Sequence, residues 1–248
     1  MCCFSRPVKA VADTNIFARG STSGRQFLVY SMLLNAGEDL AMILPLAVPQ
    51  PSNEDTVRFI SLKDYPDFFK DMRAGFPPPP QPKSDSRTHG LSNAAPKLKV
   101  VPVGNFEASF VPTIKDFARL DERFRLPEGV WDGLPGYSKF GFAVFKLKEG
   151  EHHVHPMAFE FPRSQPGKLF FPTVHIHDGK VHGRARFDHA LFCQRSQGDS
   201  LDLAHWAESK QPAGFFMKAG KAEKLVDADG HCHMKLLRGV LKNEDTWI

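Results

Sequence analysis

The sequence predicts an α+β fold that is mostly antiparallel β-sheet with a few short helices. Short apolar runs recur along the chain and are separated by turn residues such as Gly, Asn, Ser and Pro. The 22 phenylalanines, against 3 tyrosines, indicate a core rich in phenylalanine. With 248 residues, 42% of them hydrophobic, the chain is long enough to bury a sizeable core, and we expect a single domain over residues 1–248.

The first apolar runs predict a meander of antiparallel strands. They cover residues 15–20, 25–34 and 39–49, and residues 55–62 offer a fourth strand. A short helix is expected over 64–75, because Asp64 can cap it, Pro66 lies in its first turn and Gly75 ends it.

Residues 77–97 carry six prolines and almost nothing apolar, which predicts a surface loop or linker. Because a meander of three or four strands alone would bury too little surface, we expect the sheet to be completed after this segment. The remaining patterns predict strands over 98–112, 137–148 and 185–194, short helices over 114–124 and 200–210, and a hairpin over 222–243 that turns at 227–230.

Composition narrows the class of protein. The net charge of +4 is spread along the chain, so it does not argue for a nucleic-acid partner. No apolar run approaches the roughly 18 residues of a membrane helix. The start lacks the order of a secretory signal, and four cysteines are too few for a disulfide scaffold, so we expect a cytoplasmic protein with free thiols. A small-molecule or peptide substrate is compatible with this composition, and the oligomeric state stays open.

The first 75 or so residues resemble a known family. The Cys-Cys-Phe start, an Arg on the second strand, "LVYSM" and "LAMILPLAVP" are similar to the opening of DUF2330, a bacterial family of unknown function whose members are typically exported. The resemblance implies a shared strand meander and no particular reaction or ligand.

Histidines are concentrated in one stretch, since residues 152–182 hold six of the eleven. Residues 151–162 and 169–179 read as two strands joined at Pro166-Gly167. Side chains alternate faces along a strand, so His153 and His155 share one face, as do His175 and His177. A register that pairs Phe161 with Leu169 sets His155 opposite His175 and His153 opposite His177.

A second turn adds a fifth imidazole. Asp178-Gly179 is a preferred pair for a two-residue hairpin, and such a turn sets His182 opposite His175. The sequence thus predicts a histidine-rich metal-binding protein, with scope for a metal-dependent enzyme, whose ligands are His153, His155, His175, His177 and His182. Imidazoles suit a transition ion and do not distinguish Zn, Cu, Ni and Fe. The alternative is a set of ordinary, separately hydrogen-bonded histidines. Asp188 and His189 lie on opposite faces of the strand 185–194, so only one of them can face this group.

The start "MCCFS" favours a different function. Removal of Met1 would leave Cys2 with a thiol beside its own amine, which can act as a general base. This start resembles that of cysteine-type N-terminal nucleophile hydrolases, and the resemblance implies Cys2 as the nucleophile of an amidohydrolase with Arg19 on its second strand. A third hypothesis is a non-catalytic interaction module whose Pro-rich segment binds a partner.

Overall fold

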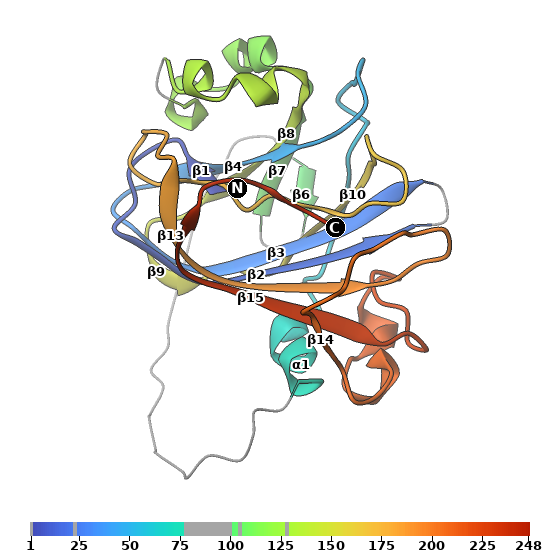
Figure 1. Cartoon of the computed structure of the whole chain (residues 1–248). Coiled ribbons are helices and arrows are strands. Elements are labelled where there is room, and N and C mark those ends of the chain that lie inside the picture. Colours follow the sequence, from blue (N-terminus) through green and yellow to red (C-terminus); the bar gives the residue numbers. More distant parts are fainter. Residues whose placement is uncertain (1, 22–23, 77–100, 104–105, 127–128) are drawn as a thin grey trace.

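Apolar side chains alternate between two faces along most strands, and two stacked sheets result in the computed structural model (Figure 1). The structure describes residues 2–21, 24–76, 101–103, 106–126 and 129–248. The first sheet, sheet A, has the order β12-β1-β4-β8-β7-β6. Its strands are β1 (Cys2–Phe4), β4 (Leu40–Leu46), β6 (Val101–Val103), β7 (Phe106–Val111), β8 (Gly141–Leu147) and β12 (His175–Ile176).

The second sheet, sheet B, has the order β14-β15-β13-β2-β3-β10-β5, and β9 pairs with the far part of β3. Its strands are β2 (Ala10–Gly20), β3 (Arg25–Ala36), β5 (Arg58–Ile60), β9 (Gly150–His153), β10 (Met157–Pro162), β13 (Arg184–Gln194), β14 (Ala207–Glu208) and β15 (Cys232–Lys242). A separate pair is formed by β11 (Phe170–Phe171) and β16 (Thr246–Trp247).

One α-helix, α1 (Phe68–Ala74), lies against the outer face of sheet B (Figure 1). The 3₁₀ helices form two groups, one over sheet A and one beside α1. They are η1 (Ile114–Arg119), η2 (Glu122–Phe124), η3 (Trp131–Gly133), η4 (Pro135–Lys139), η5 (Ala213–Phe215) and η6 (Ala219–Lys221).

Three apolar clusters fill the spaces between these layers. Every residue of β4 is buried: Leu40, Met42 and Leu44 face sheet B, whereas Ala41 and Ile43 face the 3₁₀ helices. A strand covered on both faces reads as a continuous apolar run, which explains the sequence "LAMILPL". On the other side of sheet B, Phe68, Phe69 and Met72 of α1 pack against the outward residues of β2, β3 and β13.

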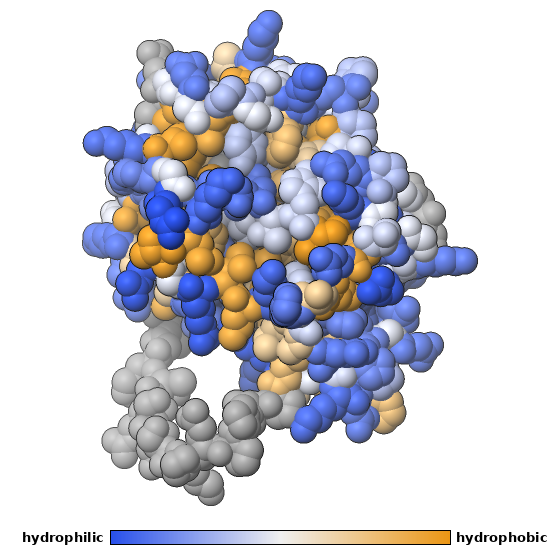
Figure 2. Space-filling view, in the orientation of Figure 1, coloured by the Kyte–Doolittle hydropathy of each residue, from blue (hydrophilic) through white to orange (hydrophobic). Residues whose placement is uncertain are grey.

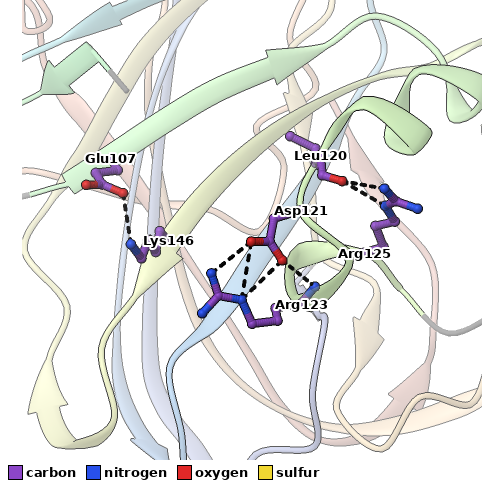
Figure 3. Close-up of polar contacts among 6 residues, drawn as sticks. All are labelled: Glu107, Leu120, Asp121, Arg123, Arg125 and Lys146. Atoms are coloured by element: carbon purple, nitrogen blue, oxygen red, sulfur yellow. Dashed lines mark hydrogen bonds and ion pairs between the residues drawn. The ribbon is translucent and has the colours of Figure 1, made fainter. Parts of the chain in front are cut away.

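Ion pairs and caps order the polar surface over sheet A (Figure 3). Asp121 accepts a hydrogen bond from the Arg123 backbone N–H at 3.0 Å and pairs with its guanidinium, which lowers the pKa of the carboxyl to about 2. Arg125 Nε donates to the Leu120 carbonyl at 2.9 Å, and Lys146 pairs with Glu107 at 3.1 Å across β8 and β7. The contacts of Asp121 and Arg125 are local to η2, and Lys146 Nζ, which lies 5.6 Å from the centre of the Phe124 ring, links η2 to the sheet.

The mostly β fold with few short helices is confirmed, and the antiparallel arrangement holds only in part. The neighbours β1 and β12 are parallel, as are β2 and β13. The hairpin predicted over 15–34 is present as β2 and β3, and the predicted helix is present as the shorter α1. The third strand of the meander exists as β4, but it pairs with β1 and β8 in sheet A, so the three-strand meander was wrong.

Two further expectations near the C-terminus were wrong. Residues 200–210 form no helix, because residues 207–209 instead pair with β15. Trp206 is buried in the apolar cluster between sheets A and B. The hairpin over 222–243 has only its second arm as a strand, β15, whose partner is β13. The Pro-rich segment 77–97 falls outside the described residues. Within them, no helix is both long and apolar enough to cross a membrane.

Candidate functional site

The predicted histidine hairpin does not form. β10 is flanked on both edges, by β3 and by β5, so it has no free edge for residues 169–177. Those residues pair elsewhere: β11 pairs with β16 and β12 with β1. The turn at Asp178-Gly179 is present, with the Lys180 N–H donating to Asp178 Oδ1 at 3.0 Å, but it does not set His182 opposite His175. His175 and His177 do lie together, as the alternation of side chains predicts, but the predicted pairing register between the two segments was wrong.

The structure separates three of the five predicted ligands. His153 is exposed on β9, opposite Leu33. His155 Nε2 lies 2.9 Å from the carbonyl oxygen of Leu62, and His182 Nε2 lies 2.9 Å from Asp178 Oδ2. His175 and His177 remain together: Nδ1 of His175 and Nε2 of His177 are 3.2 Å apart.

His189 of β13 joins His175 and His177, and we call these three residues the histidine cluster. The rings of His189 and His175 are stacked, with centroids 4.6 Å apart and planes 10° apart. Phe187 contacts both rings edge-on, and Phe4 lies 5.5 Å from the ring of His177. The cluster sits where β12, at the edge of sheet A, meets β13 of sheet B. The sequence left open whether Asp188 or His189 faces this group, and only the contact between the two sheets identifies His189.

His175 and His189 are buried, and their rings are neutral at ordinary pH. Burial, with the neighbouring His177, lowers the pKa of His175 to about 3, and burial together with His175 holds the pKa of His189 well below its usual range. Within the described residues, three ring nitrogens of these histidines have no hydrogen-bond partner. They are Nδ1 and Nε2 of His189 and Nε2 of His175. Buried polar atoms normally have such partners, so these nitrogens cost stability.

The described part of the chain contains no group of three or more His, Cys, Asp or Glu side chains placed to hold a metal ion. The two residues of the hydrolase hypothesis lie in different sheets, Cys2 in β1 of sheet A and Arg19 in β2 of sheet B. The backbone of Cys2 pairs with His175, whereas Arg19 lies five residues beyond Thr14, the β2 partner of His189. Five strand residues span about 16 Å. Arg19 Nε donates to the Leu225 carbonyl at 2.8 Å, which fastens the segment after η6.

The outer edge of sheet B presents a different kind of site. Large apolar side chains that are exposed in the described residues number four, and two of them, Leu236 (42% exposed) and Val240 (55%), lie on β15. Figure 2 shows apolar surface between polar groups on the face along which β15 runs in Figure 1. β14 covers this strand only at His233 and Met234. We call residues 235–242 of β15, with their outward backbone groups, the β15 edge.

Comparison with known proteins gives no family. No family model matches the chain, and no curated protein matches it. Among solved structures, it is similar to baculovirus P35 (TM-score 0.48, 13% identity, 96% of this chain and 95% of that one). The caspase-8/P35 complex (0.48, 12%, 95% of each chain) and a mutated baculovirus P35 after caspase cleavage (0.45, 13%, 95% and 99%) are further examples. With TM-scores below 0.5, this likeness carries no argument about function.

Proposed function

We propose that this chain is a non-catalytic protein-interaction module that binds its partner through the β15 edge. The observation that supports the proposal is the exposure of Leu236 and Val240 on one strand. Single exposed apolar residues are ordinary on protein surfaces. Here two of them share one face of a strand, four residues or about 13 Å apart, beside an edge that no described strand covers for most of its length. Such an edge is a template for binding another chain.

A photo-crosslinking residue at position 240 tests this proposal. We expect a defined protein adduct from Val240 and none from the exposed control position Lys221. The adduct partner, once purified, should bind the wild-type chain, and the double variant Leu236→Asp, Val240→Asp should bind it at least about tenfold more weakly, because a buried carboxylate opposes apolar contact. The absence of any adduct at position 240, or unchanged affinity of the double variant, would contradict the proposal.

A transition-metal site is the second candidate, and the unpartnered nitrogens of the histidine cluster favour it. Because the three rings do not converge on one centre, binding would require His189 or His175 to change rotamer. Elemental analysis after dialysis against a weak chelator tests this. Bound metal in the wild type that is lost in His175→Ala, but kept in the exposed-site variant His153→Ala, would support the site. If the wild type retains no metal, the metal site is excluded.

A further inference from the structure

The backbone of the β15 edge is open on its outer side. β15 pairs with β13 over its whole length, from Cys232 opposite Gln194 to Lys242 opposite Arg184. Its other neighbour, β14, has only two residues, opposite His233 and Met234. In the described part of the chain, no strand pairs with the outer side of residues 235–242.

Hydrogen bonds at the two ends of β15 show which backbone groups point outward. The Asn243 N–H donates to the Gly183 carbonyl at 3.0 Å, which continues the β13 register by one pair. Antiparallel pairs alternate between bonded and non-bonded, so the odd-numbered residues of β15 bond β13 and the even-numbered ones face away. At the opposite end, Cys232 fits this phase, since its N–H and carbonyl bond Ser209 on the outer side at 3.0 and 2.8 Å.

The outward groups therefore belong to Leu236, Arg238 and Val240. The Val240 carbonyl accepts a hydrogen bond from Arg184 Nη2 at 2.9 Å. The N–H groups of all three residues and the carbonyls of Leu236 and Arg238 remain for an added strand. The same three side chains lie on one face of the sheet as apolar, basic, apolar, and all are exposed. A strand added here meets a fixed order of side chains as well as a row of backbone groups.

The β15 edge carries an excess of positive charge, which favours an acidic partner. Lys235, Arg238 and Lys242 on β15, with Arg184 and Arg186 on the adjoining part of β13, give five cations. Asp188 lies 3.9 Å from Arg238 and Glu244 pairs with Lys242, so these two exposed carboxylates offset two of the five cations and leave an excess of three positive charges. Lys235 Nζ lies 6.0 Å from the centre of the Trp206 ring. A second copy of this chain is disfavoured, because an antiparallel pairing of Leu236 with Val240 would set Arg238 against Arg238 of that copy. Complementarity points to an acidic strand.

We infer that the β15 edge binds an extended acidic segment of another protein by strand addition, with apolar residues opposite Leu236 and Val240 and a carboxylate opposite Arg238. This inference rests on the proposed function and names its partner chemistry. Cationic residues on an edge strand also prevent edge-to-edge aggregation. A purely protective edge, however, would bind no acidic peptide, so a peptide separates the two roles.

The probe is a fluorescein-labelled heptapeptide, Thr-Val-Glu-Asp-Glu-Val-Thr, and its charge control is Thr-Val-Lys-Lys-Lys-Val-Thr. We expect saturable anisotropy with the acidic peptide only, weakening as salt is raised, because the Debye length shortens from about 10 Å at 0.1 M to 3 Å at 1 M. Arg238→Glu should weaken the acidic peptide about tenfold and give binding of the lysine peptide. Equal binding of both peptides by the wild type, or no binding of either, would overturn the inference.

A backbone variant separates strand addition from simple charge attraction. Leu236→Pro removes an outward N–H without removing a bond to β13, so the fold should persist, as judged by circular dichroism and the thermal midpoint. It should abolish binding of the acidic peptide. If a partner identified by crosslinking at Val240 binds Leu236→Pro as tightly as wild type yet fails to bind the double Asp variant, the interaction module stands and strand addition is wrong.

Discussion

A neutral imidazole buried in a sheet makes stability depend on pH, and His189 and His175 are two such groups. In the unfolded chain both would have a pKa near 6.5, whereas in the fold both values are lowered by burial. Below pH 6.5 the unfolded state therefore binds more protons, and the free energy of unfolding falls by up to about 1.4 kcal/mol per pH unit for each group. For His175 this loss continues down to about pH 3.

His189→Leu tests that dependence. Removal of His189, whose pKa lies well below its usual range, should flatten the fall in stability between pH 6.5 and 5, measured by urea denaturation at several pH values. His153→Gln, at an exposed position, is the control and should keep the wild-type slope. A wild-type slope in His189→Leu would show that His189 is not held neutral in the fold.

Arg163 and Asp199 form an ion pair buried at 8% and 0% exposure, 2.6 Å apart. Asp199 also accepts a hydrogen bond from the Ser196 N–H at 2.9 Å, and so joins the loop after β13 to the loop after β10. Asp199→Asn leaves the Arg163 charge buried without its counterion and should destabilise the fold by about 3–5 kcal/mol.

The exposed pair Arg119–Glu54 provides the matched control for this measurement. Glu54→Gln should change the free energy of unfolding by about 1 kcal/mol or less, because exposed ion pairs are worth little. Similar losses for Asp199→Asn and Glu54→Gln would contradict the structural role assigned to the buried pair.

At the scale of the element, the packing of β8 on β7 depends on a glycine. A Cβ on Gly141 would lie 2.2 Å from the ring of Phe110 and 3.1 Å from Val48, although the backbone of Gly141 is ordinary. Gly141→Ala should therefore cost about 1–3 kcal/mol of overpacking. Gly136, five residues earlier, has open space around it, so Gly136→Ala should be far milder in the same thermal denaturation series. Equal effects would rule out the steric explanation.

The sequence predicts individual elements better than their partners. Local alternation locates β2, β3 and β15, because its signal lies within a few residues. Gly75 marks the end of α1 as predicted, whereas the predicted N-cap Asp64 was wrong, since the helix begins after Asp67. The parallel pair β2–β13 joins residues about 175 positions apart, such as Thr14 and His189. The periodicity within each strand does not indicate this pairing. The sequence therefore could not predict that His189 contacts His175.

At the scale of the whole molecule, the C-terminal residues tie both sheets together. Asp245 accepts hydrogen bonds from the N–H groups of Thr173 and Val174 at 2.9 and 3.1 Å and from the Tyr137 hydroxyl at 2.6 Å. Trp247 packs on Phe170. The buried Gln26 of β3 donates a hydrogen bond to the Phe170 carbonyl and accepts one from the Phe170 N–H. These contacts hold the segment after β15 in place, so a strand added to β15 would meet a fixed template rather than a loose terminus.

The central claim is that the outward side of β15 is open and receives a strand. Residue-resolved amide exchange by NMR measures this directly, because alternate amides along one strand serve as each other's controls. In the free protein, the amides of Leu237, Gly239 and Leu241 should exchange slowly, since they are bonded to β13, whereas those of Leu236, Arg238 and Val240 should exchange fast. Saturation with the acidic heptapeptide should slow the second set and leave the first unchanged. Equal protection of both sets in the free protein, or fast exchange of the second set under saturating peptide, would contradict the claim.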